Sequence, residues 1–292
     1  MTEYIGSENK NKLIGVVGLG LIGASLSAAL KKSGFRVLGI DKDKSTLDFA
    51  MLAGTVDSEL TKDEIPNCDM VFIAISVDRA EEWLRENAES IGKETVVIDC
   101  CGVKRGICAL GLELSEKYGF QFIGGHPMAG KQMGGYKNSN ADLFKEATFC
   151  LVPLNKNDIR LIAEVKGVLE HAGFSRFIVM TPEEHDKVIA FTSQLAHLLS
   201  NAYIKSDIAD TEEVSSLSGG AFRDMTRVAY LDEEMWTELF IENKDNLLSE
   251  LEGFIGELEQ YRVALESGDR ETLSKLLLEG KNRKSELEKI GK

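Results

Sequence analysis

The sequence predicts an α/β protein in which a doubly wound, mainly parallel sheet is followed by an all-helical domain. Short apolar runs alternate with helix-like segments from Leu13 to about Met180, which is the order of a parallel sheet with crossover helices. From Thr181 onward only helical periodicity remains. A chain of 292 residues has the length of about two domains, so we place the sheet domain in residues 1–180 and the helical domain in residues 181–292.

The elements of the first domain are expected in regular alternation. The expected strands cover residues 13–17, 35–41, 69–76, 95–99, 120–125, 148–153 and 176–180. The expected helices cover residues 24–34, 45–53, 80–90, 106–118 and 158–172. The strand at 69–76 is apolar without interruption, as expected for a parallel strand that is buried on both faces. The alternation therefore predicts a sheet with helices on both sides.

The second domain is expected to consist of long helical segments. The first begins with Thr181 as N-cap, Pro182 at the first helical position and acidic residues in the first turn, which are strong signals for a helix start. Two more segments cover residues 234–265 and 271–290. Because such long helices carry more apolar surface than a small domain can bury, we predict a homodimer through this domain.

Composition narrows the range of partners. The net charge of −14 argues against nucleic acids and anionic membranes, which require a basic surface. The five cysteines match no zinc or redox spacing, so we expect reduced thiols, no metal site and a cytoplasmic location. Residues 1–12 are polar and predict no secretory signal, and no apolar run is long enough to span a bilayer. A small molecule is therefore the expected ligand.

The clearest motif is a glycine-rich turn between the first expected strand and the first helix. Gly18, Gly20 and Gly23 form the pattern G-x-G-x-x-G. In this context the first glycine makes the turn, the second lets the backbone approach a pyrophosphate, and the third lets helix and strand pack closely. The helix N-terminus offers free N–H groups and a positive dipole to the phosphates. The context predicts a Rossmann-type dinucleotide-binding unit, and we assign its whole loop to the cofactor site: Gly18, Leu19, Gly20, Leu21, Ile22 and Gly23.

Asp41 indicates that the dinucleotide is NAD. It ends the second expected strand, where an acid hydrogen-bonds the ribose hydroxyls and repels the extra phosphate of NADP. Lys42 follows directly and leaves the strictness for NAD over NADP open. Ser76 and Val77 end a later strand at the carboxyl edge of the sheet, where ligands bind. We therefore assign these two residues to the cofactor site as well.

His126 is the candidate catalytic base among the four histidines of the chain. It lies in the segment GGHPMAG, which we expect to form a loop at the carboxyl end of a strand. A dehydrogenase that oxidises an alcohol needs a base for the hydroxyl proton, and the pKa of histidine suits this role. The simpler alternative is a loop histidine that only makes a hydrogen bond. We assign Gly125, Pro127 and Lys131 of the same region to the substrate site.

The other three histidines are less clearly functional. His197 lies on an apolar stretch of a helix and is either a core residue or a substrate ligand. His185 lies in the first turn of the same helix, and a capping or interdomain role is favoured. His171 lies near a helix end and is expected to be solvated.

Two arginines stand out in the acidic second half of the chain. Arg223 and Arg227, in the segment GGAFRDMTRVA, would share one helical face. Arginine binds carboxylates with paired N–H donors, so these residues form a candidate carboxylate site. The alternative is that one of them makes a salt bridge with a local acid such as Asp224 or Asp232.

With these motifs in place, the chain from about Asn11 onward resembles one known family. GLGLIG with Asp41, DCCGVK, GGHPMAG, SQLAH, GGAFRDMTRVA and MWTELFIENK are similar to segments of the prephenate dehydrogenases of tyrosine biosynthesis. The resemblance implies a Rossmann-type domain followed by a helical dimerisation domain. It also implies that NAD oxidises prephenate with loss of carbon dioxide, which yields 4-hydroxyphenylpyruvate. By position, His126 matches the catalytic histidine, His197 a histidine of the substrate pocket, and Arg227 the arginine that holds a substrate carboxylate.

The sequence departs from the family at two positions. Many members carry a serine that supports the catalytic histidine where this chain has Gly102, and a second histidine where it has Gln194. Another group or water must then orient His126, because Cys101 is a poor hydrogen-bond donor. The resemblance leaves open whether the substrate is prephenate or arogenate, and whether tyrosine inhibits.

Two rival interpretations share the predicted fold. Another NAD-linked enzyme of the same plan, such as a β-hydroxyacid dehydrogenase or a pyrroline carboxylate reductase, would use a lysine or no histidine for proton transfer, and GGHPMAG argues against both. A non-catalytic NAD-binding sensor would bind the nucleotide without turnover. The absence of the serine at Gly102 keeps this second alternative open.

Overall fold

The computed structural model describes residues 12–155 and 157–290. Most of the polar segment on which the prediction of no secretory signal depends, residues 1–11, lies outside the described residues. The chain separates into two compact units, one that ends at Asn243 and one that begins at Lys244. Within the described ranges, no helix is both long and apolar enough to cross a membrane.

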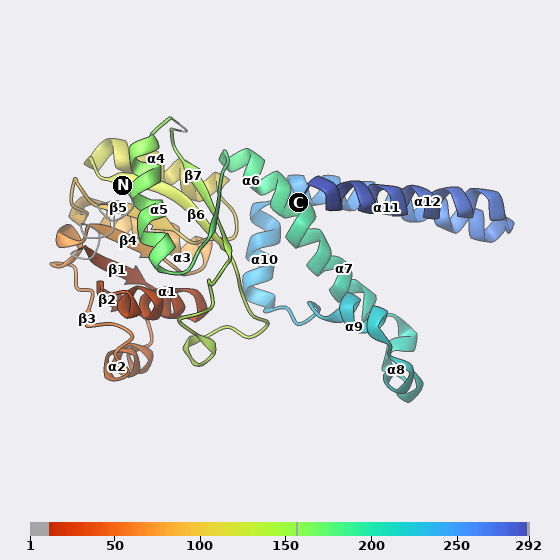
Figure 1. Cartoon of the computed structure of the whole chain (residues 1–292), viewed down its shortest axis with the longest axis horizontal. Coiled ribbons are helices and arrows are strands. Elements are labelled where there is room, and N and C mark those ends of the chain that lie inside the picture. The colour runs from red at the N-terminus through yellow and green to blue at the C-terminus, as the bar shows by residue number, and fades with distance from the viewer. Residues whose placement is uncertain (1–11, 156, 291–292) are drawn as a thin grey trace. The chain divides into compact units, whose positions relative to one another are not determined.

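In the described residues of the first unit, eight strands form one sheet in the order β3-β2-β1-β4-β5-β6-β7-β8 (Figure 1). The strands are β1 (Leu13–Val17), β2 (Arg36–Ile40), β3 (Ser58–Glu59), β4 (Met70–Ile73), β5 (Val96–Asp99), β6 (Gln121–Met128), β7 (Thr148–Pro153) and β8 (Arg176–Val179). Neighbouring strands pair in parallel, except that β6 and β7 are antiparallel. The prediction of a mainly parallel sheet is confirmed, although the short strand β3 was not predicted.

Helices cover both faces of this sheet. On one face lie α1 (Leu21–Lys32), α2 (Lys44–Leu52) and α5 (Ile159–His171), and on the other lie α3 (Val77–Asn87) and α4 (Arg105–Tyr118). Successive strand residues alternate between the two cores: Val16 and Phe72 pack in the first, and Val17 and Val71 in the second. This alternation explains why the strands are apolar throughout, and it confirms the doubly wound fold.

After β8 the described chain of the first unit is helical. Its helices are α6 (Pro182–Ile189), a π-helical segment (Ala190–Leu195), α7 (Ala196–Tyr203), a short 3-10 helix (Asp207–Asp210), α8 (Glu212–Leu217), α9 (Gly220–Thr226) and α10 (Glu233–Glu242). The chain passes from sheet to helices between β8 and α6. A division into domains at residue 180 stays a prediction.

The second unit is a pair of helices, α11 (Lys244–Ser267) and α12 (Arg270–Ile290), which pack against each other. The prediction of one uninterrupted helix over residues 234–265 was wrong, because α10 ends before Asn243. Asn243 leaves the helical region with φ −117° and ψ 24°. Its side chain donates instead to the carbonyl oxygen of Asp186 and to Oε1 of Gln194. These tertiary hydrogen bonds override a helical periodicity that continues across the break.

Candidate active site

The glycine loop connects β1 with α1 and depends on the absence of side chains at two positions. Gly18 has φ +88°, and a Cβ atom there would lie 2.3 Å from Cγ2 of Ile75 and 2.6 Å from the carbonyl oxygen of Ala74. A Cβ atom at Gly23 would lie 1.8 Å from the carbonyl oxygen of Gly18. The turn and the close approach of α1 to the sheet therefore both require glycine, for the reasons that the sequence pattern suggests.

Gly20 is different, because it faces open space. A Cβ atom at Gly20 would meet no atom within 4 Å, and Gly20 is the N-cap of α1 without a side-chain cap. The first amides of a helix have no acceptor within the helix, so Leu21, Ile22 and Gly23 offer N–H groups beside this opening. An unobstructed backbone at the positive end of a helix dipole fits a pyrophosphate. The loop therefore fits a dinucleotide.

Asp41 follows β2 and is fixed by two backbone amides. Its Oδ2 accepts a hydrogen bond from Leu19 N at 2.7 Å, and its Oδ1 accepts one from Asp43 N at 2.9 Å. Each carboxylate oxygen has a further lone pair, so the side chain can still accept from ribose hydroxyls. The side chain of Leu19 is buried, so this residue shapes the loop through its backbone.

Ser76 and Val77 begin α3 at the carboxyl end of β4 and differ in exposure. Ser76 is the N-cap and is partly exposed. Val77 is 3% exposed and packs in the core. The next amide, Asp78 N, donates to Oε1 of Glu238 on α10 at 2.6 Å. Of the two predicted cofactor contacts, only Ser76 has a side chain that is accessible to a ligand.

His126 lies inside β6, so the prediction that it belongs to a loop was wrong. Glycine and proline usually interrupt strands, which is why GGHPMAG suggests a loop. Here the antiparallel partner β7 extends the strand, and His126 pairs with Cys150. The parallel pairing of β6 with β5 already ends at Ile123. His126 thus projects beyond the carboxyl end of β5, at the edge of the sheet where the glycine loop lies.

A buried ion pair holds the backbone that leads to His126. Asp99, the last residue of β5, accepts hydrogen bonds from Gly125 N at 3.1 Å and Cys101 N at 2.9 Å. The ammonium group of Lys104 forms an ion pair with the same carboxylate, and both side chains are fully buried. Burial opposes the charge of Lys104, but the carboxylate of Asp99 raises the pKa of this lysine above its usual range. The site therefore contains a permanent buried cation.

The glycine loop and His126 are joined by neighbouring contacts along this edge. Ile75 lies against Gly18, and its carbonyl oxygen faces the thiol of Cys101 at 3.8 Å. Cys101 shares the carboxylate of Asp99 with the strand that carries His126. Two of the predicted site elements, the cofactor loop after β1 and the candidate base on β6, thus lie at the same edge of the sheet, with β4 and β5 between their strands.

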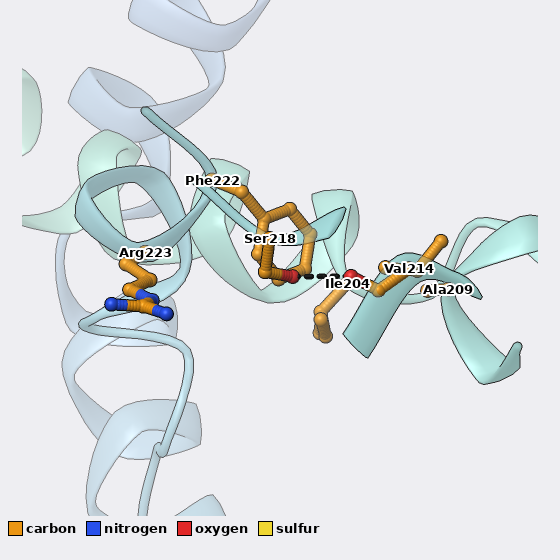
Figure 2. Close-up of a pocket in the computed structure, with 6 residues that line it drawn as sticks. All are labelled: Ile204, Ala209, Val214, Ser218, Phe222 and Arg223. Carbon is orange, nitrogen blue, oxygen red and sulfur yellow. Dashed lines mark hydrogen bonds between the residues drawn. The ribbon is translucent and has the colours of Figure 1, made fainter. Parts of the chain in front are cut away.

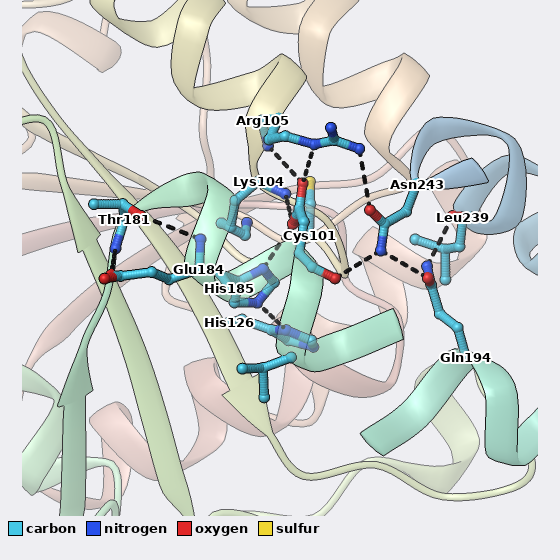
Figure 3. Close-up of polar contacts among 12 residues, drawn as sticks. Cys101, Lys104, Arg105, His126, Thr181, Glu184, His185, Gln194, Leu239 and Asn243 are labelled. Atoms are coloured by element: carbon cyan, nitrogen blue, oxygen red, sulfur yellow. Dashed lines mark hydrogen bonds and ion pairs between the residues drawn. The ribbon is translucent and has the colours of Figure 1, made fainter. Parts of the chain in front are cut away.

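The nearest polar partner of His126 is a second histidine. Nδ1 of His126 lies 2.9 Å from Nε2 of His185, and Nδ1 of His185 lies 2.8 Å from Oδ1 of Asp186 (Figure 3). The side chains of His185 and Asp186 are each 1% exposed. Oδ1 of Asp186 also accepts from Lys104 N at 2.7 Å, and Oδ2 accepts from Arg105 N at 3.0 Å. His185 therefore does not cap its helix, which Thr181 and Glu184 do; its contact with His126 joins α6 to β6, across the boundary predicted at residue 180.

The start of α6 places His185 and Asp186 in this position. The Thr181 hydroxyl accepts from Glu184 N, and the Glu184 carboxylate accepts from Thr181 N, with Pro182 at the first helical position. This capping box fixes where the helix begins. The helix start was predicted from these residues, and that prediction is confirmed.

Burial and charge keep the histidine pair neutral. Burial lowers the pKa of His126 well below the ordinary value of 6.5, and His185 and Lys104 lower it further. Burial also lowers the pKa of His185, against the opposing effect of Asp186. The carboxyl group of Asp186 keeps a lowered pKa despite burial, because His185 and the amide of Arg105 donate to it. His126 is thus an unprotonated base near neutral pH.

The remaining predicted substrate residues lie on other elements. His197 stacks on Trp236 with ring centroids 4.1 Å apart, and its Nδ1 lies 2.8 Å from the Ser193 carbonyl oxygen. Lys131 is exposed and donates to the Asn138 carbonyl oxygen at 2.6 Å. In the described residues, no hydrogen bond or ring contact joins His197 to His126, so the structure does not bring these two histidines together.

The two arginines lie near α9 with exposed side chains. Among the described residues, neither Arg223 nor Arg227 makes an ion pair, so the expected salt bridge to a local acid is not found. The carbonyl oxygen of Arg227 accepts a hydrogen bond from Gln132, which ties the segment after β6 to α9. A cavity of about 440 Å³ lies beside Arg223 (Figure 2). Its lining residues are Ile204, Ala209, Val214, Ser218, Phe222 and Arg223.

Comparison with known proteins matches both parts of the chain to one family. Residues 26–179 match the nucleotide-binding domain of prephenate dehydrogenase, and residues 181–279 match its dimerization domain. The chain belongs to the prephenate dehydrogenase family. It is therefore a dehydrogenase with a nucleotide-binding domain.

Individual relatives agree with the family match. A prephenate dehydrogenase of Bacillus subtilis strain 168 is 31% identical over 267 residues, which are 88% of this chain and 71% of the relative. The structure of A. aeolicus prephenate dehydrogenase in complex with hydroxyphenyl propionate and NAD+ has 28% identity and a TM-score of 0.82, over 94% of this chain and 98% of that one. Synechocystis arogenate dehydrogenase has 28% identity and a TM-score of 0.79, over 94% and 99%. The resemblance is confirmed, and these relatives give no support to a non-catalytic sensor.

At the two positions where this chain departs from the prephenate dehydrogenase family, Gly102 and Gln194, the structure shows contacts with α10. A Cβ atom at Gly102 would lie 2.9 Å from Cδ2 of Leu239, so the side chain of Leu239 occupies the space beside Gly102. Gln194 is buried and donates to the Leu239 carbonyl oxygen at 2.8 Å, while Asn243 donates to Gln194. The thiol of Cys101 faces Ile75 rather than His126, as expected of a poor substitute donor.

Proposed function

We propose that this chain oxidises prephenate to 4-hydroxyphenylpyruvate, with release of carbon dioxide and reduction of NAD+. The position of His126 supports this proposal most directly. Its Nδ1 is engaged by His185, so Nε2 remains for the substrate, and its pKa is lowered by burial. A neutral imidazole at the carboxyl edge of the sheet, beside the glycine loop, can accept the proton of a ring hydroxyl. Related proteins from Bacillus subtilis and A. aeolicus are prephenate dehydrogenases.

Different residues of the proposed cofactor site bind different parts of NAD+. When bound, NAD+ accepts the hydride from the ring carbon that bears the hydroxyl group. The amides at the start of α1 and the open backbone at Gly20 suit its pyrophosphate. Asp41 suits the ribose hydroxyls, and its negative charge disfavours the extra phosphate of NADP. Ser76 closes the edge of this site from the next strand.

The substrate site is proposed around His126. His126 takes the hydroxyl proton, and Gly125 and Pro127, both buried, fix the strand on either side of it. The exposed guanidinium group of Arg227, which has no ion-pair partner among the described residues, suits a substrate carboxylate. Lys131 and His197 are proposed as further substrate ligands.

Arogenate is the second candidate substrate. The match to Synechocystis arogenate dehydrogenase favours it, because that structure covers nearly the same part of this chain as the prephenate dehydrogenase. Arogenate differs from prephenate in the side chain, which carries an amino group in place of a keto group. The proton and hydride steps at the ring are the same for both, so His126 does not discriminate between them.

Turnover with separate substrates tests the proposal. Purified protein with NAD+ is mixed with prephenate or with arogenate, and the absorbance of NADH is followed. We expect turnover with prephenate and its loss in His126→Asn. Turnover with arogenate alone would show that arogenate, not prephenate, is the substrate. Binding of NAD+ without turnover of either compound would refute the proposed reaction.

We also propose a homodimer through the helical domain and a cytoplasmic location. Apolar side chains that are more than half exposed lie along α11 and α12: Leu248, Ile255, Leu258, Val263, Leu265, Leu277, Leu278 and Leu287. A second copy of the chain would remove such side chains from water. Sedimentation at micromolar concentration should give the mass of two chains, and a monomer would refute the dimer. The five cysteines are free in the described residues, which supports a reducing compartment.

A further inference from the structure

We propose that His185 and Asp186 form a positioning relay behind His126, in which Asp186 fixes the tautomer of His185 and His185 makes Nε2 of His126 the proton-accepting atom. The catalytic consequence rests on the proposed function. The tautomers themselves do not depend on it, so they can be tested without substrate.

The direction of each hydrogen bond follows from Asp186. An ionised carboxylate only accepts hydrogen bonds, so Nδ1 of His185, at 2.8 Å from Oδ1, carries a proton. In neutral His185 the other nitrogen, Nε2, then has the lone pair. Nε2 of His185 lies 2.9 Å from Nδ1 of His126, so Nδ1 of His126 must be the donor. Nε2 of His126 is left as the basic nitrogen (Figure 3).

Asp186 is held firmly enough to set this order. Oδ1 accepts from Lys104 N at 2.7 Å, and Oδ2 accepts from Arg105 N at 3.0 Å and Arg105 Nε at 3.3 Å. Its backbone carbonyl oxygen accepts from Asn243. These donors come from the start of α4 and from the residue after α10, so the carboxylate cannot turn away from His185 without losing them. Two backbone amides, of Lys104 and Arg105, thus determine which nitrogen of His126 is basic.

The relay gives the transferred proton a defined path. The O–H bond of the substrate breaks and a bond forms from that hydrogen to Nε2 of His126. The proton on Nδ1 of His126 can then move to Nε2 of His185, which leaves the positive charge beside Asp186, still ionised. The ammonium group of Lys104 disfavours a cation on His126, so moving the charge towards Asp186 is favourable. No electrons are transferred in these steps.

The same contacts explain how the family's serine can be absent. At Gly102 no side chain is available, and Leu239 fills the neighbouring space. The support that such a serine would give to His126 comes from His185 on α6 instead. The charged and titratable groups that face the histidine pair belong to four elements: Asp99 at the end of β5, Lys104 and Arg105 at the start of α4, Cys150 on β7, and Asp186 on α6.

The tautomers can be read by nuclear magnetic resonance of protein labelled with ¹⁵N-histidine. With four histidines in the chain, each signal is assigned by replacing one residue. We expect His126 to carry its proton on Nδ1, in contrast to histidine in water, which favours Nε2. His185→Asn is too short to reach His126 and should shift it to the Nε2–H form, whereas the amide oxygen of His185→Gln should preserve the Nδ1–H form. An Nε2–H tautomer in the unaltered protein overturns the proposal, even if both variants fail to fold.

Kinetics with prephenate and NAD+ test the catalytic half. His185→Asn should lower kcat about 100-fold, the size of a general-base effect, with KM for prephenate unchanged because His185 does not touch substrate. His185→Gln should recover about tenfold of this loss, since it restores orientation but not proton transfer. In both variants the acid limb of kcat/KM should move to higher pH, because His185 no longer depresses the pKa of His126.

Two controls separate the possible outcomes. His171→Gln alters a histidine whose ring contacts Phe35 and should leave kcat, KM and the acid limb unchanged. Thermal unfolding and NAD+ binding of the His185 variants show whether they are folded. Equal losses in both variants with an unmoved acid limb would reduce His185 to a packing residue and overturn the relay. If the unaltered protein does not turn over prephenate, the proposed function fails, while the tautomer of His126 still decides the relay.

Discussion

Gly20→Ala and Gly23→Ala separate cofactor binding from folding at the glycine loop. A Cβ atom at Gly20 meets nothing within 4 Å, and the backbone there has φ −72°, which any residue adopts. Alanine is a poorer N-cap than glycine, so the free energy of unfolding should fall by only about 0.5 to 1 kcal/mol. The added methyl group projects into the opening at the start of α1. It should displace a pyrophosphate from amides that donate charged hydrogen bonds, each of about 1.5 to 3 kcal/mol, so the Kd for NAD+ should rise roughly 10- to 100-fold.

Gly23→Ala should have the opposite profile. Its Cβ atom would lie 1.8 Å from the carbonyl oxygen of Gly18, which is backbone and has no side-chain freedom. Either the turn or α1 must move, and overpacking of this kind costs about 3 kcal/mol or more. For a folded unit of this size the melting temperature should fall by about 6 to 12 °C. Loss of NAD+ binding would follow from the distorted turn.

Urea unfolding and calorimetric titration with NAD+ measure the two effects separately. The expected pattern is normal stability with weak binding for Gly20→Ala, and low stability for Gly23→Ala. If Gly20→Ala binds NAD+ as tightly as the unaltered protein, the pyrophosphate does not lie over Gly20. If Gly23→Ala unfolds at the same urea concentration as the unaltered protein, the packing of α1 against the turn is not as close as the structure indicates.

Four further predictions test the rest of the site. Lys104→Met leaves a buried charge on Asp99 without its cation, so the free energy of unfolding in urea should fall by about 3 to 5 kcal/mol; an unchanged midpoint would contradict the buried pair. Arg227→Ala should raise KM for prephenate roughly 10- to 100-fold through loss of a charged hydrogen bond, and an unchanged KM rejects its carboxylate role. Gly102→Ser should change kcat by less than about threefold, or roughly 0.5 kcal/mol, because Nδ1 of His126 already has a partner; a large gain would show that the missing serine limits turnover. The acid limb of kcat/KM should lie below pH 6.5, since burial lowers the pKa of His126 and the base works unprotonated. Below pH 6.5 the unfolded chain binds more protons than the folded one, so the free energy of unfolding should fall as the pH drops. An acid limb of kcat/KM at or above pH 6.5 would show that the pKa of His126 is not lowered in the folded protein.

The parts of the fold that depend on local signals could be predicted from the sequence. The unit of β1, α1 and β2 follows from a glycine pattern between apolar runs, because each glycine has a local steric reason. The start of α6 follows from Thr181, Pro182 and Glu184 in the same way. The break at Asn243 could not be predicted, because it is stabilised by hydrogen bonds to Asp186 and Gln194, which are far away in the sequence.

Residues of the candidate site could be predicted only where the neighbouring sequence itself indicates their role. His126 is flanked by residues that place it near the sheet edge, so its importance was visible even though its strand was mistaken for a loop. His185 lies 59 positions further along the chain, and its contact with His126 depends on the packing of α6 beside β6. The adjacent pair of His185 and Asp186 was the one available signal. Without the fold, a capping role explained it equally well.

The two departures from the family meet at a single residue. Gly102 leaves the space that the side chain of Leu239 occupies, and Gln194 donates to the carbonyl oxygen of the same residue. A Cβ atom at 102 would lie 2.9 Å from Cδ2 of Leu239, so the end of this side chain would have to shift, while Gln194 holds the backbone carbonyl of the same residue. Both departures therefore lie against the same residue of α10. The contact that orients His126 comes from another helix, because His185 on α6 lies 2.9 Å from Nδ1 of His126.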